Sequence, residues 1–274
     1  MELMLDSANL EEIKKIKDLG LLAGLTTNPL IIKRGIEEMS YQGSFYDLAK
    51  QILDLTENKP CFFQTTGHSA KDMTERAKRI YSNLHKYGNV YIKVPINPAL
   101  NDSHDIFAGI ETLSTLIKAK IPTLATAIVT PSQAYMAAQV RADYAVLMLR
   151  PYDNIIAEEL GINLDQTGYF SDESARQAYQ TKGIVEASSY ISGIGTLKAA
   201  SKMFESRDLE TKLILAGIRN PVQFDSAINE KGVSAITLPY MVFRHLLSHK
   251  GTRTFVEQTY EGAPEIYKAF IEND

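Results

Sequence analysis

Short runs of apolar residues recur along the chain, and most are followed by a segment with apolar residues at helical spacing. The runs lie at Leu3–Ala8, Leu21–Thr27, Lys59–Thr65, Tyr91–Ile96, Thr123–Val129, Tyr144–Leu149, Lys212–Ala216 and Ala235–Leu238. The helical segments include Ala70–Leu84, Ile106–Ala119, Pro131–Arg141 and Pro221–Glu230. Strands that alternate with helices pair in parallel, so these eight units predict an α/β fold, a closed (β/α)8 TIM barrel. An open doubly wound sheet is the alternative, although no G-x-G-x-x-G fingerprint supports a dinucleotide fold.

The gap between the sixth and seventh runs, from Arg150 to Lys212, is too long for one loop and one helix. Within it lie the segments Gly161–Phe170, Ser171–Lys182 and Val185–Lys202. We therefore predict an inserted helical element within residues 152–202. It either packs on the outer ring of helices or caps the barrel mouth, which the loops after the strands line. The whole chain, 1–274, is predicted to be a single TIM-barrel domain.

Composition and charge argue against several classes of protein. The 274 residues are 45% hydrophobic and 23% charged, which is enough for a large core in one barrel domain. The net charge of −4 and the lack of a basic stripe argue against a nucleic-acid partner. No apolar stretch approaches membrane-spanning length, and the amino-terminal residues do not resemble a signal peptide. The lone cysteine, Cys61, fits a reducing compartment, so we expect a cytoplasmic protein.

One charged residue interrupts the fourth apolar run. Strand alternation puts Val90, Ile92 and Val94 on one face and Tyr91 and Lys93 on the other. A lysine among apolar neighbours loses hydration, which lowers its pKa and frees a nucleophilic amine. Such an amine can attack a carbonyl and form a Schiff base. The alternative is a strand-end lysine whose stem is buried and whose ammonium reaches water.

Other polar residues collect where the predicted strands end. Barrel chemistry takes place at the carboxyl ends of the strands, where side chains from different strands converge. In chain order, these ends carry Asp6, Thr26, Thr27, Asn28, Gln64, Lys93, Thr126, Arg150 and Arg219. The sequence therefore predicts one cavity that these side chains share.

Residue type suggests a role for most of these side chains. Asp6 can pair with the Lys93 ammonium or take the proton of a substrate hydroxyl, unless it caps the following helix. Asn28 and Gln64 both donate and accept hydrogen bonds, so they suit sugar hydroxyls. Thr126 can hold a catalytic water together with Gln64, although a β-branched strand filler is the ordinary interpretation.

The two arginines could bind an anion, whereas the histidines show no metal-binding pattern. Arg150 and Arg219 can fork a phosphate, but a surface salt bridge is the commoner fate of an arginine. The five histidines have no metal-ligand spacing such as H-E-x-x-H. No G-x-S-x-G, P-loop or C-x-x-C motif is present. None of these patterns indicates a metal site.

Five short motifs occur in order along almost the whole chain. They are Asp6-Ser7-Ala8-Asn9, Gly24-Leu25-Thr26-Thr27-Asn28-Pro29, Tyr91-Ile92-Lys93-Val94-Pro95, Ala216-Gly217-Ile218-Arg219-Asn220-Pro221 and Ile236-Thr237-Leu238-Pro239. Together they resemble motifs of the small transaldolase and fructose-6-phosphate aldolase family, which are class I, Schiff-base aldolases. The first three together are specific to that family, and the predicted insertion lies outside the resemblance.

The resemblance implies a barrel without a metal or organic cofactor. It implies that Lys93 forms an imine with a ketose or a dihydroxyacetone unit, and that C–C cleavage follows. Asp6 would transfer the proton near the C4 hydroxyl. Gln64 and Thr126 would position the water for imine formation and hydrolysis.

The resemblance also implies which residues bind the substrate. Asn28, with its neighbour Thr27, would contact the bound three-carbon unit, and Arg219 would contact a phosphate. The chain departs from the family at Gly217, where a phosphate-binding serine is usual. The sixth strand also departs, and Arg150 would replace the family's arginine there with a one-residue shift.

Two features point to different branches of the family. Gln64 resembles the aldolase branch, since transaldolases usually have glutamate there. The tyrosine that marks the aldolase branch is absent, with Leu147 or Met148 near its place. Transaldolase and aldolase therefore both stay open. Family members often form pentamers or decamers in which the C-terminal helix reaches a neighbour, and we predict a homo-oligomer with such a helix over Phe255–Ile271.

The leading hypothesis is a cytoplasmic Schiff-base transaldolase or aldolase that acts on a small sugar or sugar phosphate. A catalytically silent barrel that binds or senses such sugars is the alternative from a different functional class. A further alternative is another lysine aldolase that uses an aldehyde donor.

Overall fold

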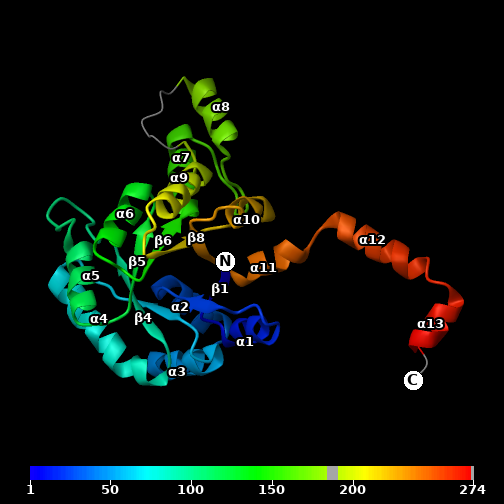
Figure 1. Ribbon diagram of the computed structural model, residues 1–274, viewed down its shortest axis with the longest axis horizontal. Coiled ribbons are helices and arrows are strands. Elements are labelled where there is room, and N and C mark those ends of the chain that lie inside the picture. Colours follow the sequence, from blue (N-terminus) through cyan, green and yellow to red (C-terminus); the bar gives the residue numbers. More distant parts are fainter. Residues whose placement is uncertain (184–190, 273–274) are drawn as a thin grey trace.

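Eight parallel strands close into a barrel in the computed structural model, which describes residues 1–183 and 191–272 (Figure 1). The strands are β1 Glu2–Asp6, β2 Gly24–Thr26, β3 Cys61–Gln64, β4 Val90–Pro95, β5 Thr123–Ile128, β6 Tyr144–Met148, β7 Lys212–Ala216 and β8 Val233–Leu238. They pair in chain order, and the β1–β8 ladder, which aligns Leu3 with Ile236, closes the ring. The predicted (β/α)8 barrel is confirmed, and the doubly wound alternative is wrong.

Helices surround the barrel on its outer side. They are α1 Leu10–Asp18, α2 Pro29–Glu38, α3 Phe45–Thr56, α4 Ala70–Leu84, α5 Ala108–Lys118, α6 Pro131–Gln139, α10 Pro221–Ile228 and α11 Tyr240–Leu247, with a 3-10 turn η1 at His85–Tyr87. Asn9 caps α1 by accepting a hydrogen bond from the Glu11 backbone nitrogen at 3.1 Å, so Asp6 is not the cap. Among the helices that the structure describes, none is long and apolar enough to cross a membrane.

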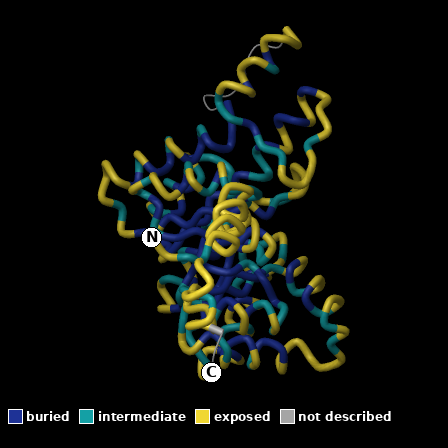
Figure 2. The backbone as a smooth tube through the Cα atoms, turned by 90° about the vertical axis from the view of Figure 1, so that its right-hand side faces the viewer, coloured by how far each residue is buried: buried dark blue, intermediate teal, exposed yellow. Residues whose placement is uncertain are grey.

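The strands separate an inner apolar layer from an outer one, and Figure 2 shows the buried strands at the centre of the molecule. In β4, Val90, Ile92 and Val94 belong to the layer between the strands and the helices. Tyr91 packs against the cluster inside the barrel. Because Lys93 follows the same alternation as Tyr91, its side chain faces the barrel interior.

Within the described residues, three helices lie between β6 and β7. They are α7 Leu149–Leu160, α8 Asp172–Lys182 and α9 Gly193–Ser206. α7 and α8 pack around an apolar cluster of their own, and α8 stands away from the outer ring of helices in Figure 1. This cluster includes Ile156, Leu160, Phe170, Ala175 and Tyr179. The predicted segment Val185–Lys202 falls partly outside the described residues, which omit 184–190.

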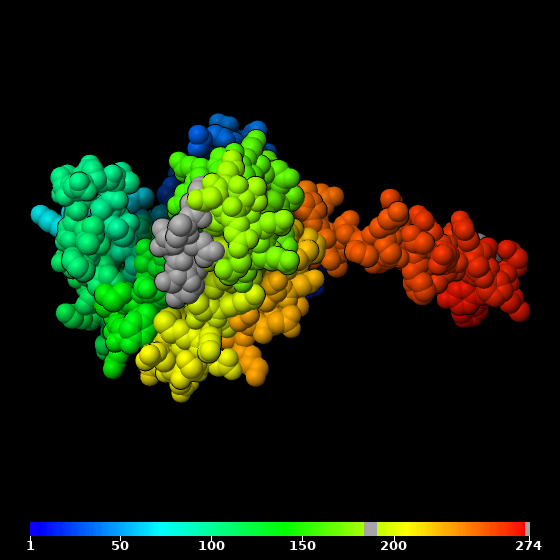
Figure 3. All heavy atoms as spheres, turned by 90° about the horizontal axis from the view of Figure 1, so that it is seen from above, coloured from blue at the N-terminus to red at the C-terminus, as the bar shows by residue number. Residues whose placement is uncertain are grey.

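The chain ends in two helices, α12 Lys250–Glu261 and α13 Glu265–Glu272, which project away from the barrel (Figure 3). The single helix predicted over Phe255–Ile271 is therefore divided. Pro264 lacks an N–H group and disfavours helical conformation in the residue before it. It opens α13 instead, where its carbonyl oxygen accepts from the Tyr267 backbone nitrogen at 2.9 Å.

Candidate active site

Lys93 lies inside the barrel near the carboxyl end of β4. Only 6% of its surface is exposed, and its Nζ donates to the Thr27 carbonyl oxygen at 3.2 Å. The side chain lines a cavity of about 400 Å³, which Asp6, Asn28 and Arg219 also line. The amine is buried but borders an open space, as a nucleophilic lysine requires.

Lys93 and Asp6 influence each other's protonation in this cavity. Burial lowers the pKa of Lys93, and the nearby Asp6 carboxylate partly offsets this effect. Burial raises the pKa of Asp6, while Lys93 and a hydrogen bond from Thr26 act in the opposite direction. Because burial disfavours both charges, the neutral and ionised forms of the pair lie closer in free energy than in water. The pair is therefore suited to proton transfer.

Two threonines hold the Asp6 carboxylate in place. Thr26 Oγ1 donates to Asp6 Oδ1 at 2.6 Å and lies 2.7 Å from Thr237 Oγ1. Both threonines are buried, and Thr26 is aligned with Asp6 in the β1–β2 ladder. The sequence analysis placed Thr26 among the polar strand ends but gave it no role, and Thr237 was not predicted. Alternation along β2 could have indicated Thr26, because in a strand only one of the neighbours Thr26 and Thr27 faces inward.

Thr27 lies next to the Lys93 amine. It has no exposed surface, and its Oγ1 donates to the Phe62 carbonyl oxygen at 2.8 Å. Only its backbone carbonyl contacts the Lys93 amine. Thr27 therefore contacts the nucleophile through its backbone, while its predicted contact with the three-carbon unit stays a prediction.

Asn28 lines the cavity and also begins α2. Its Oδ1 accepts hydrogen bonds from the backbone nitrogens of Leu30 and Ile31, both at 2.9 Å. Capping the first turn of a helix in this way satisfies N–H groups that have no partner within the helix. Because the cap uses the carbonyl oxygen, a ligand in the cavity would meet the amide nitrogen.

Gln64 and Thr126 flank Lys93 on neighbouring strands. Gln64 is aligned with Lys93 in the β3–β4 ladder, and Thr126 is aligned with Pro95 in the β4–β5 ladder. In both strands the residue two positions earlier packs inside the barrel, so both side chains face the interior. Next to Thr126, Ala127 has a φ of +58° where the β5–β6 register shifts. Bulges of this kind often redirect side chains beside active sites.

Arg219 and Arg34 border the far end of the cavity. Burial and the nearby Arg150 guanidinium lower the pKa of Arg219. Within the described residues, Arg219 Nε is buried without a hydrogen-bond partner. An unpaired buried donor costs about 1–3 kcal/mol, which an anionic ligand would offset. Arg34, on α2, is not among the residues predicted from the sequence, because strand ends give no information about the facing side of a helix.

Arg150 borders the same cavity, but its terminal nitrogens bind the inserted region. Nη1 donates to the Gly168 carbonyl oxygen at 2.9 Å. Nη2 donates to the carbonyl oxygens of Leu164 and Asp165 at 3.3 and 2.8 Å. This arrangement differs from the predicted phosphate fork of Arg150 and Arg219, because the Arg150 guanidinium donates its hydrogen bonds to a loop of the same chain.

Gly217 allows α7 to approach the end of β7. It has a φ of +82°, and a Cβ added there would lie 2.7 Å from the Arg150 backbone nitrogen. The Leu149 backbone nitrogen would lie 3.2 Å away. A serine at position 217 would therefore force α7 to move, and Gly217 lines the cavity through its backbone alone.

The described residues contain neither a cluster of metal-ligating side chains nor a reactive cysteine. In the described ranges, no group of three or more histidine, cysteine, aspartate or glutamate residues is placed to hold a metal ion. Cys61 is buried, and burial raises the pKa of its thiol to about 12. A thiol in that state is a poor nucleophile.

Known proteins resemble the chain over nearly its full length. Residues 3–273 match the family model of transaldolase/fructose-6-phosphate aldolase. A probable transaldolase of Aquifex aeolicus (strain VF5) is 27% identical over 270 residues, covering 97% of this chain and 99% of that protein. A probable transaldolase of Leptospira biflexa serovar Patoc is 27% identical over 263 residues, covering 94% and 98%. The chain therefore belongs to the transaldolase/fructose-6-phosphate aldolase family.

Proposed function

We propose that the protein is a class I transaldolase or fructose-6-phosphate aldolase-like enzyme in which Lys93 forms a Schiff base with a ketose. The observation that carries the proposal is the buried Lys93 amine, which lines a cavity of about 400 Å³ together with Asp6. Membership of the family supports the same class of reaction. The Lys93 pKa, lowered by burial, supports an amine that is neutral more often than an exposed lysine.

The chemistry follows from these two side chains. The neutral Lys93 amine attacks the C2 carbonyl of the ketose, and loss of water gives a protonated imine. The Asp6 carboxylate takes the proton of the C4 hydroxyl, and the C3–C4 bond breaks as its electron pair moves toward the imine nitrogen. An aldehyde leaves, and an enamine stays on Lys93.

The fate of the enamine separates the two branches of the family. In transfer, the enamine carbon attacks an acceptor aldehyde, and Asp6 returns its proton to the new hydroxyl. In simple cleavage, the enamine carbon takes that proton instead. Water then hydrolyses the imine and restores Lys93. We assign this water to Gln64 and Thr126, which flank Lys93 on β3 and β5.

The proposed substrate is a small sugar or sugar phosphate. Asn28 would bind a hydroxyl of the three-carbon unit through its amide nitrogen, since its carbonyl oxygen caps α2. Arg219 and Arg34 would bind a phosphate at the far end, and the unpaired Nε of Arg219 supports this assignment. No cofactor is part of the proposal. We also propose that residues 1–274 form one domain and that the protein is cytoplasmic.

Incubation with dihydroxyacetone or fructose 6-phosphate and borohydride is expected to attach a reduced ketose to Lys93. Borohydride reduces the imine to a stable amine, so the adduct is measured as added mass on the peptide that contains Lys93. Adding erythrose 4-phosphate as a different acceptor to the reaction with fructose 6-phosphate separates transfer from cleavage, because only a transaldolase needs an acceptor for turnover. If a folded protein formed no adduct with any ketose, the proposed function would be wrong.

A catalytically silent sugar-binding barrel is the second candidate. Gly217 and the engagement of Arg150 by its own loop favour it, because both change the far end of the site. Calorimetry that detects tight binding of sugar phosphate, together with no trapping and no turnover, would support this candidate. Trapping at Lys93 would exclude it.

We further propose that the protein is a homo-oligomer, a pentamer or decamer as the family resemblance implies. The apolar side chains of α12 and α13 support this, since many of them are largely exposed. They include Phe255, Tyr260, Ile266 and Phe270, with 66%, 71%, 82% and 80% of their surface exposed. Apolar side chains gathered in this way are typical of an interface.

Removing the chain after Ser248 is expected to convert the oligomer to smaller species, measured by light scattering. The Phe255→Glu variant is expected to do the same, because it places a charge on the apolar side of α12. The matched control is Thr254→Glu, which lies on the opposite side of that helix and should leave the mass unchanged. An unchanged mass after truncation would contradict the proposed role of the two helices.

A further inference from the structure

Two polar side chains bind the loop between α7 and α8. Arg150 donates to its carbonyl oxygens, with distances of 2.8 Å to Asp165 and 2.9 Å to Gly168. Asn220, which caps α10, donates its Nδ2 to the Thr167 carbonyl oxygen at 2.8 Å. The loop is therefore bound from the ends of both β6 and β7.

A buried carboxylate links the inserted region to Arg219. Asp153 has no exposed surface and accepts from the Gly193 backbone nitrogen at 3.2 Å and from Gln223 Nε2 at 3.4 Å. Gln223 Oε1 accepts in turn from the Arg219 backbone nitrogen at 2.9 Å. One chain of hydrogen bonds thus sets the positions of both the inserted helices and Arg219.

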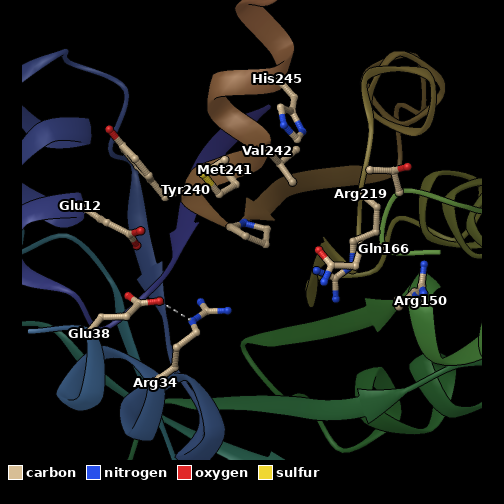
Figure 4. A pocket seen from close by; sticks show the side chains of 12 residues that line it. Glu12, Arg34, Glu38, Arg150, Gln166, Arg219, Tyr240, Met241, Val242 and His245 are labelled. Atoms are coloured by element: carbon tan, nitrogen blue, oxygen red, sulfur yellow. Dashed lines mark ion pairs between the residues drawn. The ribbon is translucent and has the colours of Figure 1, made fainter.

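This fixed loop carries Gln166 to the outer rim of the site. A second cavity of about 430 Å³ adjoins the one that contains Lys93, and Arg34, Arg150 and Arg219 line both. Gln166 lines the second cavity, and Figure 4 shows its side chain beside that of Arg219. The inserted region therefore contributes a hydrogen-bonding side chain next to the arginine whose Nε has no partner.

We propose that Gln166 is a specificity-determining residue whose amide donates to the anionic group bound by Arg219 and Arg34. The inference rests on the proposed function, because it places the substrate carbonyl at Lys93 and a phosphate at these arginines. A neutral amide adds no charge to a cavity where burial, Arg150 and Arg34 already lower the pKa of Arg219 and where Arg34 Nε lies 3.6 Å from Glu38 Oε1. It also supplies an uncharged donor at the end of the site where Gly217 has no side chain.

The Gln166→Ala variant is expected to raise KM for fructose 6-phosphate about 10-fold, with little change in kcat, because a hydrogen bond to a charged group contributes about that much to binding. Gln166→Glu is expected to raise KM further, since a carboxylate repels the phosphate. Borohydride trapping of dihydroxyacetone, which carries no phosphate, should stay at the wild-type rate in both variants. The matched control is Gln177→Glu on the exposed side of α8, with wild-type values expected.

An unchanged KM in both Gln166 variants would overturn the proposal, and so would an equal loss of dihydroxyacetone trapping. A wild-type protein that traps no ketose would show instead that the proposed function has failed. Calorimetric titration with inorganic phosphate then decides the role of Gln166 by itself. A Kd about 10-fold weaker in Gln166→Ala and unchanged in Gln177→Glu supports it. The same Kd in all variants, or no binding by the wild type, overturns it.

Discussion

Replacing Lys93 with methionine is expected to abolish trapping of dihydroxyacetone and to lower turnover of ketose substrates by about 1,000-fold or more. Methionine keeps an apolar stem of similar length but has no amine to attack the carbonyl. Lys93 is 6% exposed, and burial opposes its charge, so the variant is expected to fold. Mass spectrometry of the reduced adduct and the rate of aldehyde release measure the two effects.

The matched control for this variant is Lys78→Met, which removes an exposed ammonium from α4 and should leave trapping intact. An adduct on a different lysine in Lys93→Met, or turnover near the wild-type rate, would place the nucleophile elsewhere. Circular dichroism of both variants separates loss of chemistry from loss of folding.

The rate of trapping is also expected to depend on pH, because the reactive form of Lys93 is the neutral amine. Only the neutral amine attacks a carbonyl, so the initial rate is expected to rise with pH. Because burial holds the Lys93 pKa below its ordinary value of 10.5, the rise should level off before that pH. A rate that keeps rising through pH 10.5 would indicate an exposed lysine instead.

Replacing Asp6 with asparagine is expected to lower kcat about 100- to 10,000-fold while trapping at Lys93 persists. Asparagine has a similar shape and can still accept the Thr26 hydrogen bond, but it cannot take the proton of the C4 hydroxyl. Single-turnover cleavage of fructose 6-phosphate measures the chemical step, and borohydride trapping measures imine formation. The single-turnover rate should fall by the same factor as kcat, whereas the rate of trapping should stay near the wild-type value.

Asp6 should also leave a signature in the pH profile. Burial raises its pKa above the ordinary value of 3.8, so kcat should fall on the acid side at a higher pH than an exposed aspartate would give. This limb should disappear in Asp6→Asn. The matched control is Asp225→Asn on the exposed side of α10, which should keep the wild-type profile. Wild-type turnover by Asp6→Asn would exclude Asp6 as the proton-transfer residue.

The strand positions and their inward faces were predictable from the sequence, because each depends on local pattern. The range of α4, Ala70–Leu84, agrees with the prediction, and each strand lies close to its predicted run. Alternation along β4 placed Lys93 opposite Val90, Ile92 and Val94, as observed. A closed barrel then brings strand ends together, so the shared cavity of Lys93, Asp6 and Arg219 followed from topology.

Other features depended on contacts between segments far apart in the chain. Thr27 gave no sign that its hydroxyl binds the Phe62 carbonyl oxygen, which lies on another strand. Arg34 faces the cavity because of the way α2 packs on the barrel, which a strand-end pattern does not report. The division of the C-terminal helix was the exception, since Pro264 was a local signal for it.

The sequence by itself determined the barrel, the inward Lys93 and the set of polar strand ends, because period-two alternation and strand–helix order are local properties. Only the tertiary structure decided the far end of the site. There, Arg150 binds loop carbonyls that are 14 to 18 residues away. The backbone of α7 also lies so close to Gly217 that any side chain at that position would clash with it. The physical reason is that hydrogen-bond partners and close backbone contacts depend on how separate segments pack, and adjacent residues do not encode that packing.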